Sequence, residues 1–374
     1  MQYEINLDHA SHTPVDERVL AEFIRLEREF PGNPTAAHNL GQKAAAELER
    51  ITHGVAHILG AVPQEIIFTS GASESNNLAI KGITQAYKHI GRHILSTPLE
   101  HPSISGTLSH LQLQGYEIEL LKIMPNGQVD LDYLRKVKRK DTVLVCISAI
   151  DSELGIVQPL EEIADILGDI FLHIDAAQAV GKIANHGENY ATKSISAHKF
   201  YGLSGVGILV KRGDVVLEPQ IHGGKSATVY RSGTPTLSLA GATLTALEIA
   251  TVEIETRTKA VQKLNSYLRE KLPHINSPEQ SSPFILNTST PGIRGVVMQD
   301  ELAKHGINIS VKSACSADSS PSRAVLAVTG NKKLAQCSWR ISLSHHNTMD
   351  EMNQLLTAVG EVTSAKATIG YTIN

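Results

Sequence analysis

The sequence predicts an α/β fold with a largely parallel β-sheet in a large domain, followed by a smaller α+β domain. Short apolar segments alternate with longer amphipathic segments through the first two-thirds of the 374 residues, a pattern typical of strands connected by helices. A helical pattern over residues 240–272 then precedes fewer, more widely spaced apolar segments. We therefore expect a long helix to link two domains.

Seven apolar segments have the length of strands and are expected to form the sheet. They are residues 65–70, 93–98, 117–123, 142–150, 170–176, 193–198 and 205–211. Amphipathic segments between most of them predict helices at 40–59, 74–89, 103–114, 130–138 and 159–168. The smaller domain is expected to contain strands in the segments FILNTS, GINISV and WRISLS. We place residues 16–255 in the large domain and 256–374, together with 1–15, in the small domain.

The composition narrows the class of protein. With 41% hydrophobic and 19% charged residues, the chain has the make-up of an ordinary globular protein with buried cores. Its net charge of −4 gives no electrostatic reason to bind nucleic acid or an anionic membrane. The 17 histidines are scattered. Neither an HExxH motif nor paired Cys/His spacing occurs, so we predict no metal site.

The chain is expected to act in the cytoplasm. Its start, MQYEINLDH, has neither the basic residues nor the apolar core of a secretory signal. The longest apolar segment, VLVCISAI, is too short to span a bilayer. Three cysteines give no disulfide framework and fit a reducing compartment.

The three cysteines lie in different surroundings. Cys146 lies inside an apolar strand and Cys337 precedes Trp339, so both are expected to be inert core residues. Cys315 lies in the small, polar segment KSACSADSSPS. A thiol in such a loop is free to react and to move.

The strongest chemical signal lies at the ends of two successive apolar strands. The segment IFLHID ends in Asp175, and KSISAHK ends in Lys199. A lysine at the mouth of an apolar strand is well explained by a Schiff base, because desolvation lowers the pKa of the amine and makes it nucleophilic. An aspartate on the neighbouring strand could keep a pyridinium nitrogen protonated, as pyridoxal phosphate (PLP) requires. The two residues could also simply form an ion pair.

A second signal is the turn at 69–77, which follows the strand EIIF and opens a helix. Its small residues, among them Ala72 and Ser73, would expose backbone N–H groups at the positive end of the helix. That arrangement suits a phosphate group. The same turn could instead serve only to cap the helix.

Further polar residues could belong to the same site. His101, after the strand HILSTP, could stack on an aromatic ring or shuttle protons, or it could be a hydrogen-bonded structural residue. Arg340, in the apolar segment SWRISLS, could bind a carboxylate in a bidentate pair or be a surface charge. The segment RSGT at 231–234 could contact the phosphate or form a plain turn.

Together these segments resemble the cysteine desulfurase family, within the aminotransferase class V group of fold-type I PLP enzymes. The resemblance covers nearly the whole chain. The matching segments, in chain order, are LDHASHTPVDERV, GNPTAAHNLG, FTSGASESNN, EH, SELGIVQP, DAAQAVGK, SISAHKFYGLSGVGIL, HGG, RSGT, SAC and WRISLS. The resemblance implies a PLP-dependent transferase whose large domain has a mostly parallel seven-stranded sheet flanked by helices.

The resemblance also implies how the residues would hold the PLP ring. Lys199 would form the Schiff base, Asp175 would pair with the pyridine nitrogen, and His101 would stack over the ring. Gln178 would contact the ring hydroxyl. Ser152 stands where the family has an asparagine that makes the same contact.

The phosphate, the substrate and the sulfur are assigned in the same way. The residues implied to hold the phosphate are Ala72, Ser73, Ser196, His198 and, from the partner subunit of a homodimer, Thr234. Arg340, with Asn33 nearby, would bind the carboxylate of the substrate amino acid. Cys315 would be the mobile nucleophile.

The implied activity converts L-cysteine to L-alanine. Lys199 would take the Cα proton with help from His101, and Cys315 would capture the sulfur as a persulfide. An acceptor protein would then receive that sulfur. The sequence leaves open whether it serves iron–sulfur clusters, tRNA thiolation or DNA phosphorothioation.

The chain departs from the family pattern at several places. ASHT replaces an AATT-like opening, Asp151-Ser152 replaces a pair of asparagines, and Lys225 and Lys312 stand where glycine is common. Two other interpretations stay open. One is a selenocysteine lyase or C–S lyase of the same fold, and the other is a catalytically weakened PLP-binding scaffold in a sulfur-transfer complex.

Overall fold

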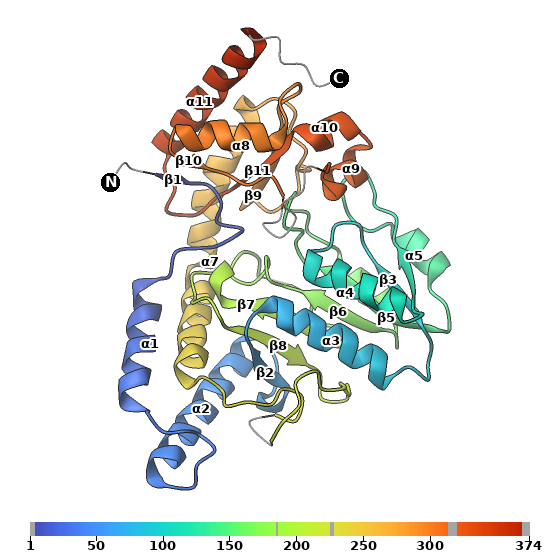
Figure 1. Ribbon diagram of the computed structural model, residues 1–374, viewed down its shortest axis with the longest axis vertical. Coiled ribbons are helices and arrows are strands. Elements are labelled where there is room, and N and C mark those ends of the chain that lie inside the picture. Colours follow the sequence, from blue (N-terminus) through green and yellow to red (C-terminus); the bar gives the residue numbers. More distant parts are fainter. Residues whose placement is uncertain (1–3, 185, 225–227, 313–319, 369–374) are drawn as a thin grey trace.

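The computed structural model describes residues 4–184, 186–224, 228–312 and 320–368 (Figure 1). Its larger part is built on a seven-stranded sheet with the strand order β2-β8-β7-β6-β5-β3-β4. The strands are β2 (Ile66–Thr69), β3 (His93–Ser96), β4 (Glu117–Leu120), β5 (Thr142–Ser148), β6 (Phe171–Asp175), β7 (Thr192–Ser196) and β8 (Gly207–Lys211). Each overlaps a strand predicted from the sequence, so the predicted α/β fold is confirmed.

The direction of the strands decides where a site can form. Strands β4, β3, β5, β6 and β7 are parallel, whereas β8 runs antiparallel to both β7 and β2. Strand β2 therefore runs in the same direction as β7. As a result, the carboxyl ends of β2, β3, β5, β6 and β7 meet at one edge of the sheet, where open α/β sheets bind their ligands.

Helices cover both faces of this sheet. The helices are α1 (Glu17–Glu29), α2 (Asn39–Ile58), α3 (Ala72–Ala86), α4 (Pro102–Leu113), α5 (Leu131–Val137) and α6 (Leu160–Leu167). One apolar cluster joins α3 and α4 to the sheet, and a larger cluster joins α2, α5 and α6 to its other face. Strand β5 is buried along its whole length, as its apolar sequence predicts for a parallel strand between two helical layers.

Helix α1 was not predicted from the sequence. Asp16 caps it by accepting the backbone N–H of Arg18. The helix packs along a later and much longer helix, α7 (Leu237–Lys271). Its burial therefore depends on a partner more than 200 residues away in sequence.

The smaller part of the molecule lies above the sheet in the view of Figure 1. It contains the antiparallel pair β9 (Ile285–Ser289) and β11 (Ser338–Ser342), and the parallel pair β1 (Ile5–Asn6) and β10 (Ile307–Asn308). Its helices are α8 (Gly295–Lys304), α9 (Arg323–Thr329), α10 (Lys332–Cys337) and α11 (Met349–Thr368). The predicted strand GINISV is shorter than expected, because only Ile307 and Asn308 form β10, and Ser310 adds an isolated bridge to Arg340.

Helix α7 contributes to both cores. Its first half supplies Leu244 and Leu247 to the large apolar cluster, and its second half supplies Leu264 and Leu268 to the cluster of the smaller part. The predicted boundary at residue 255 falls between these halves. By length and composition alone α7 could cross a membrane, but 56% of its apolar window is buried inside the protein. We therefore describe it as a core helix.

Candidate active site

A cavity of about 330 Å³ lies at the carboxyl edge of the sheet, where the two parts of the molecule meet. The residues that follow β2, β3, β5, β6 and β7 form most of its wall, and β11 of the smaller part supplies one side chain. The sequence-predicted site residues that line it are Ala72, Ser73, His101, Ser152, Asp175, Gln178, Ser196, His198, Lys199 and Arg340. The fold thus gathers ten candidates from six separate chain segments.

Lys199 lies in the short 3-10 helix η2 (Ala197–Lys199) that follows β7. Its Nζ donates hydrogen bonds to the carbonyl oxygens of Ala10 at 2.8 Å and Ser11 at 2.6 Å. Both acceptors are backbone carbonyl oxygens of the segment before α1, and they fix the direction of the amine.

Asp175, the last residue of β6, is only 5% exposed and is held by amide groups. Its Oδ1 accepts the backbone N–H of Ala177 at 2.9 Å, and its Oδ2 accepts the side-chain amide of Asn76 at 2.8 Å. Asn76 Oδ1 lies 2.9 Å from Nε2 of His173. Burial lowers the pKa of His173 to about 4, so this ring is neutral. The carboxylate is therefore fixed in place by neutral donors.

His101 is the N-cap of α4. Its Nδ1 accepts the backbone N–H of Ser103 at 3.1 Å and lies 2.9 Å from Ser103 Oγ. Burial lowers the pKa of His101; the nearby Asp175 opposes this effect, and the positive charges of Lys199 and Arg340 add to it. The ring is fixed on one side and lines the cavity on the other.

The turn between β2 and α3 forms one end of the cavity. Ala72 and Ser73 begin α3, whose N-terminus carries the positive end of the helix dipole. Across the cavity wall, Ser196 Oγ lies 3.1 Å from His198 Nδ1. The backbone approaches closely here, because a Cβ on Gly207 of β8 would lie 2.6 Å from the Gly71 backbone. These groups form a compact cradle of hydrogen-bond donors.

An ion pair ties the predicted segment 231–234 to this turn. Glu74 Oε2 accepts the backbone N–H of Ser70 at 2.7 Å, and Glu74 Oε1 pairs with Arg231 Nε at 2.9 Å. The arginine thereby offsets the carboxylate that α3 places beside the cradle. Its neighbour Thr234 is exposed.

Arg340 in β11 is the cavity residue that comes from the smaller part of the molecule. It is 1% exposed. Its Nη2 donates to Asp8 Oδ1 at 2.6 Å and to Ser11 Oγ at 2.8 Å, and its Nη1 donates to the carbonyl of Ser152 at 2.8 Å. Among the described residues, its buried Nε has no hydrogen-bond partner. A guanidinium that lines the cavity is suited to bind a further acceptor such as a carboxylate.

Gln178 is fixed from two sides. Its Nε2 donates to the carbonyl of Ala10 at 2.8 Å, and its Oε1 accepts from Nζ of Lys182. Lys182 is 7% exposed. Burial, together with the positive charges of Lys199 and Arg340, lowers the pKa of Lys182 to about 7. The amide of Gln178 is therefore held in one orientation at the cavity wall.

Asn33 and Thr234 do not line the cavity of a single chain. Asn33 lies in the exposed loop between α1 and α2, where its Oδ1 accepts from the backbone N–H and the hydroxyl of Thr35, both at 2.9 Å. The prediction that Asn33 contributes to binding the substrate carboxylate stays a prediction. The prediction for Thr234 concerns a partner subunit and stays a prediction. Cys315 and Lys225 lie outside the described residues.

Several residues around the cavity were not foreseen. Ser11, Glu74, Ser103 and Ser148 line it, while Asp8, Asn76, Glu100 and Lys182 hold the side chains that do. Asp8, Asn76, Glu100 and Lys182 all fall inside segments that carried the family resemblance. Their roles depend on contacts between segments far apart in the chain, which no single motif reveals.

Glu100 is one of these unforeseen residues. It lies directly before His101 and accepts hydrogen bonds from the hydroxyls of Ser148 at 2.6 Å and Thr97 at 2.7 Å. Burial raises the pKa of Glu100 to about 7. The side chain therefore supports the wall formed by Ser148.

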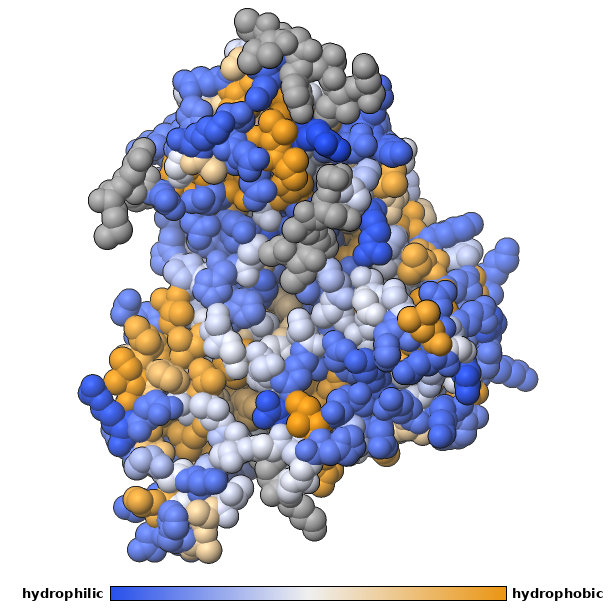
Figure 2. Space-filling model, in the orientation of Figure 1, coloured by the Kyte–Doolittle hydropathy of each residue, from blue (hydrophilic) through white to orange (hydrophobic). Residues whose placement is uncertain are grey.

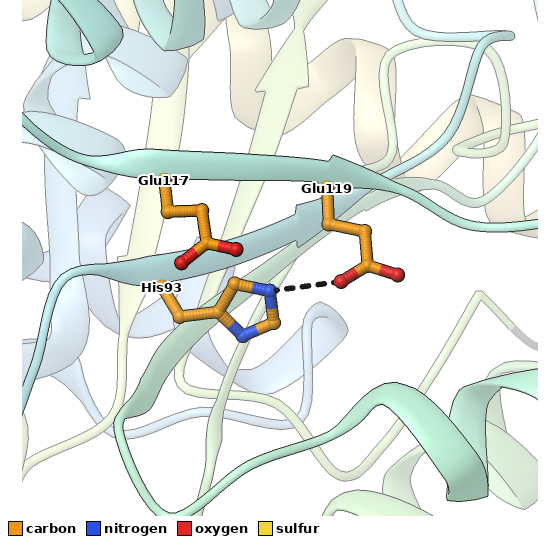
Figure 3. A group of neighbouring side chains, drawn as sticks. All are labelled: His93, Glu117 and Glu119. Carbon is orange, nitrogen blue, oxygen red and sulfur yellow. Dashed lines mark ion pairs between the residues drawn. The ribbon is translucent and has the colours of Figure 1, made fainter.

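Three potential metal ligands form a compact group at the β3–β4 edge of the sheet. They are His93, Glu117 and Glu119 (Figure 3). His93 Nε2 lies 3.3 Å from Glu119 Oε2, and Glu119 Oε1 accepts the hydroxyl of Tyr133 at 2.9 Å. Arg139 donates to both oxygens of Glu117, at 2.9 and 2.7 Å. These contacts account for the group, and we assign it no metal.

Known proteins resemble this chain over almost its whole length. The aminotransferase class-V family matches residues 5–355. The cysteine desulfurase IscS of Dictyoglomus turgidum is 33% identical over 381 residues, covering 99% of this chain and 97% of that protein. The structure of a NifS-like protein matches with a TM-score of 0.91 at 35% identity, covering 97% of this chain and 100% of that one. A structure of SspA in complex with cysteine matches with a TM-score of 0.80 at 30% identity, covering 92% of this chain and 100% of that one.

The chain therefore belongs to the aminotransferase class-V family, and proteins named cysteine desulfurases are among its relatives. This confirms both the family resemblance and the fold class predicted from the sequence.

The family implies PLP, and the residues of the cavity fit that group. The cradle at α3, with the close approach of Gly207 to Gly71, suits a phosphate. The buried Asp175 offers an acceptor for a protonated ring nitrogen, and Lys199 places an amine on the same cavity. Phosphate, ring and aldehyde would each find a matching group here.

Proposed function

We propose that this protein is a PLP-dependent cysteine desulfurase, which converts L-cysteine to L-alanine and passes the sulfur to Cys315. The observation that carries the proposal is Arg340. Its guanidinium lines the same cavity as Lys199 and Asp175, where a charged, planar set of donors can bind a further acceptor. An amino-acid carboxylate supplies such an acceptor, and the amine beside it would face Lys199.

The cofactor would be held by the large part of the molecule. Its phosphate would bind at the cradle formed by Ala72, Ser73, Ser196 and His198, its ring nitrogen at Asp175 and its ring hydroxyl at Gln178, with His101 against the ring. When bound, PLP supplies an electron sink that stabilises negative charge at the substrate Cα. Lys199 would attach the cofactor and then take the Cα proton.

The substrate would be oriented by its carboxylate. Arg340 is fixed by Asp8, Ser11 and the carbonyl of Ser152, so binding needs little further ordering of the guanidinium. The substitution of serine for the family's asparagine at position 152 leaves this backbone contact available. The change from asparagine to Ser152 is therefore expected to leave Arg340 in the same orientation.

Cys315 would attack the sulfur of the substrate. The carbon–sulfur bond breaks, a sulfur–sulfur bond forms on Cys315, and the substrate carbon is protonated to give alanine. Cysteine and one enzyme thiol thus become alanine and one enzyme persulfide, with atoms and electrons balanced. An acceptor protein would then take the persulfide sulfur. We keep iron–sulfur cluster assembly, tRNA thiolation and DNA phosphorothioation as the possible destinations.

The active form would be a homodimer in the cytoplasm. Thr234 is exposed and lies outside the cavity of its own chain, so it is free to reach a partner's phosphate site. Apolar side chains are exposed over α1 (Figure 2), among them Leu20 and Ile24, and Val252 on α7 is 82% exposed. Such surfaces favour burial against a second copy.

The test combines product assays with a spectrum. Wild-type protein incubated with L-cysteine and PLP should give alanine and an enzyme persulfide, and it should show the absorbance of bound PLP. Cys315→Ser should lose sulfur transfer while keeping the absorbance. Cys337→Ala, at the buried end of α10, is the matched control and should keep both the sulfur transfer and the absorbance.

Two outcomes would contradict the proposal. If Cys315→Ser still released sulfide and alanine at the wild-type rate, the protein would be a lyase of the same fold. If the protein stayed colourless with added PLP, the cofactor assignment itself would be wrong.

A further inference from the structure

The ring of His101 is fixed through its Nδ1. This nitrogen accepts the backbone N–H of Ser103 at 3.1 Å, and Ser103 Oγ lies 2.9 Å from it. A nitrogen that accepts a backbone N–H must offer a lone pair, because a protonated nitrogen is a donor only. Nδ1 of His101 is therefore unprotonated in this arrangement.

The hydroxyl of Ser103 is directed by Asn76. The side-chain amide of Asn76 donates to Ser103 Oγ at 2.8 Å and to Asp175 Oδ2 at 2.8 Å. Since Ser103 Oγ accepts from Asn76, its own hydrogen is free to point at Nδ1 of His101. Two donors of Ser103, the backbone N–H and the hydroxyl, thus converge on one ring nitrogen.

The orientation of the Asn76 amide is itself determined. If the amide were flipped, its oxygen would face the carboxylate of Asp175, and two acceptors would lie 2.8 Å apart. In the observed orientation Oδ1 instead lies 2.9 Å from Nε2 of His173, whose Nδ1 lies 2.9 Å from the hydroxyl of Thr192. Every group in this buried chain of hydrogen bonds is satisfied if Thr192 donates to His173 and His173 donates to Asn76.

We propose that Ser103 is a positioning residue, which holds His101 neutral with its single ring proton on Nε2. On the cavity side His101 then presents a hydrogen-bond donor instead of the lone pair of a base. The task of removing the Cα proton is left to Lys199, which revises the expectation that His101 assists in it. The tautomer stands on these contacts, whereas its use in catalysis rests on the proposed desulfurase function.

The charges around the ring agree with a neutral His101. Lys199 from η2 and Arg340 from β11 disfavour a positive ring, as does burial, and Asp175 from β6 favours one. Asp175 is already engaged by Asn76 and a backbone amide. The positive end of the α4 dipole lies at Nδ1 and opposes protonation there.

The proposal can be tested by nitrogen NMR on the full-length, PLP-loaded protein with ¹⁵N-labelled histidine. His101 is assigned as the signal lost in His101→Gln. Wild type should show the Nε2–H tautomer between pH 6 and 8. Ser103→Ala keeps the backbone donor but loses the hydroxyl, so the His101 titration midpoint should rise by roughly half to one pH unit.

Two further variants separate positioning from general disturbance. Ser103→Thr retains a hydroxyl and should restore the wild-type signal. Ser105→Ala removes a serine two residues along the same helix, whose hydroxyl contacts Arg323, and should leave His101 unchanged. The inference is overturned if wild type shows Nδ1–H or a protonated ring, or if Ser103→Ala matches wild type.

The alanine assay run on the same samples distinguishes the two proposals. An Nε2–H signal in a protein that makes no alanine from cysteine would contradict the desulfurase function alone. An active desulfurase with an Nδ1–H signal would contradict the tautomer assignment alone.

Discussion

The two walls of the cavity are built in different ways. On the large-domain wall, the side chains follow parallel strands of one sheet, and Asp175 and His101 are held by neighbours from the same domain. On the opposite wall, Arg340 is held across a junction by Asp8 and by the carbonyl of Ser152. Asp175 and His101 are thus fixed by residues of the larger part of the molecule, whereas Arg340 is fixed only where three chain segments meet.

This difference indicates which changes should affect chemistry and which should affect substrate binding. Changes on the large-domain wall, here called the sheet wall, should alter the absorbance of the bound cofactor. Changes around Arg340 should alter the KM for cysteine and leave the absorbance intact. The following predictions test that division, beginning with the largest effect.

Replacing Lys199 with alanine should abolish turnover. The variant loses both the amine that attaches the cofactor and the base, so alanine formation should fall by at least about 10³-fold. Absorbance of bound PLP and alanine release are the measurements. A variant that kept a tenth of the wild-type rate would show that Lys199 is not the reacting amine.

Replacing Arg340 with lysine should raise the KM for cysteine. Lysine keeps the charge but loses the planar set of donors, so kcat/KM should fall about 10²-fold, mostly through KM. Asp8→Asn should act in the same direction but more weakly. Asp141→Asn, whose carboxylate pairs with the surface residue Arg139, is the control. If Arg340→Lys changed the PLP absorbance and left KM unchanged, the two walls would not differ in the way that we propose.

Replacing Gly207 with alanine should weaken cofactor retention. The added Cβ would lie 2.6 Å from the Gly71 backbone, so the turn that opens α3 must shift. Overpacking of this kind costs about 1–3 kcal/mol, or about 5- to 150-fold in PLP affinity. Gly106→Ala on α4 is the control, because an added Cβ there has no atom within 4 Å. Equal rates of PLP dissociation in the two variants would contradict the assignment of this cradle as the phosphate site.

Replacing His173 with asparagine should make stability less sensitive to pH. The folded pKa of about 4 lies below the ordinary value of 6.5. Between these values the unfolded chain binds a proton that the folded chain does not, so the wild-type free energy of unfolding falls as pH falls from 6.5 to 4. In the variant this slope should be shallower by at most about 1.4 kcal/mol per pH unit. Urea unfolding at several pH values measures this slope. If wild type and variant lost stability with pH at the same rate, the lowered pKa of His173 would be contradicted.

The sequence allowed much of the sheet wall to be predicted. Strands β5 and β6 are largely apolar segments; Asp175 is the last residue of β6, and Lys199 follows the end of β7 by three residues. Helix α1 was missed because its burial depends on α7. The role of Asn33 beside Arg340 comes from the resemblance alone and stays a prediction; in the structure its side chain accepts the backbone N–H of Thr35.

By itself, the sequence determined the alternation of strands and helices and which residues stand at the strand ends, because burial of apolar side chains fixes a periodic pattern that local sequence carries. Tertiary structure alone decided the state of those residues. The tautomer that we propose for His101 depends on Asn76 and Ser103, and the orientation of the Arg340 guanidinium depends on Asp8, Ser11 and Ser152. Such hydrogen bonds join segments up to 332 residues apart, and their directions follow from three-dimensional geometry that no local pattern records.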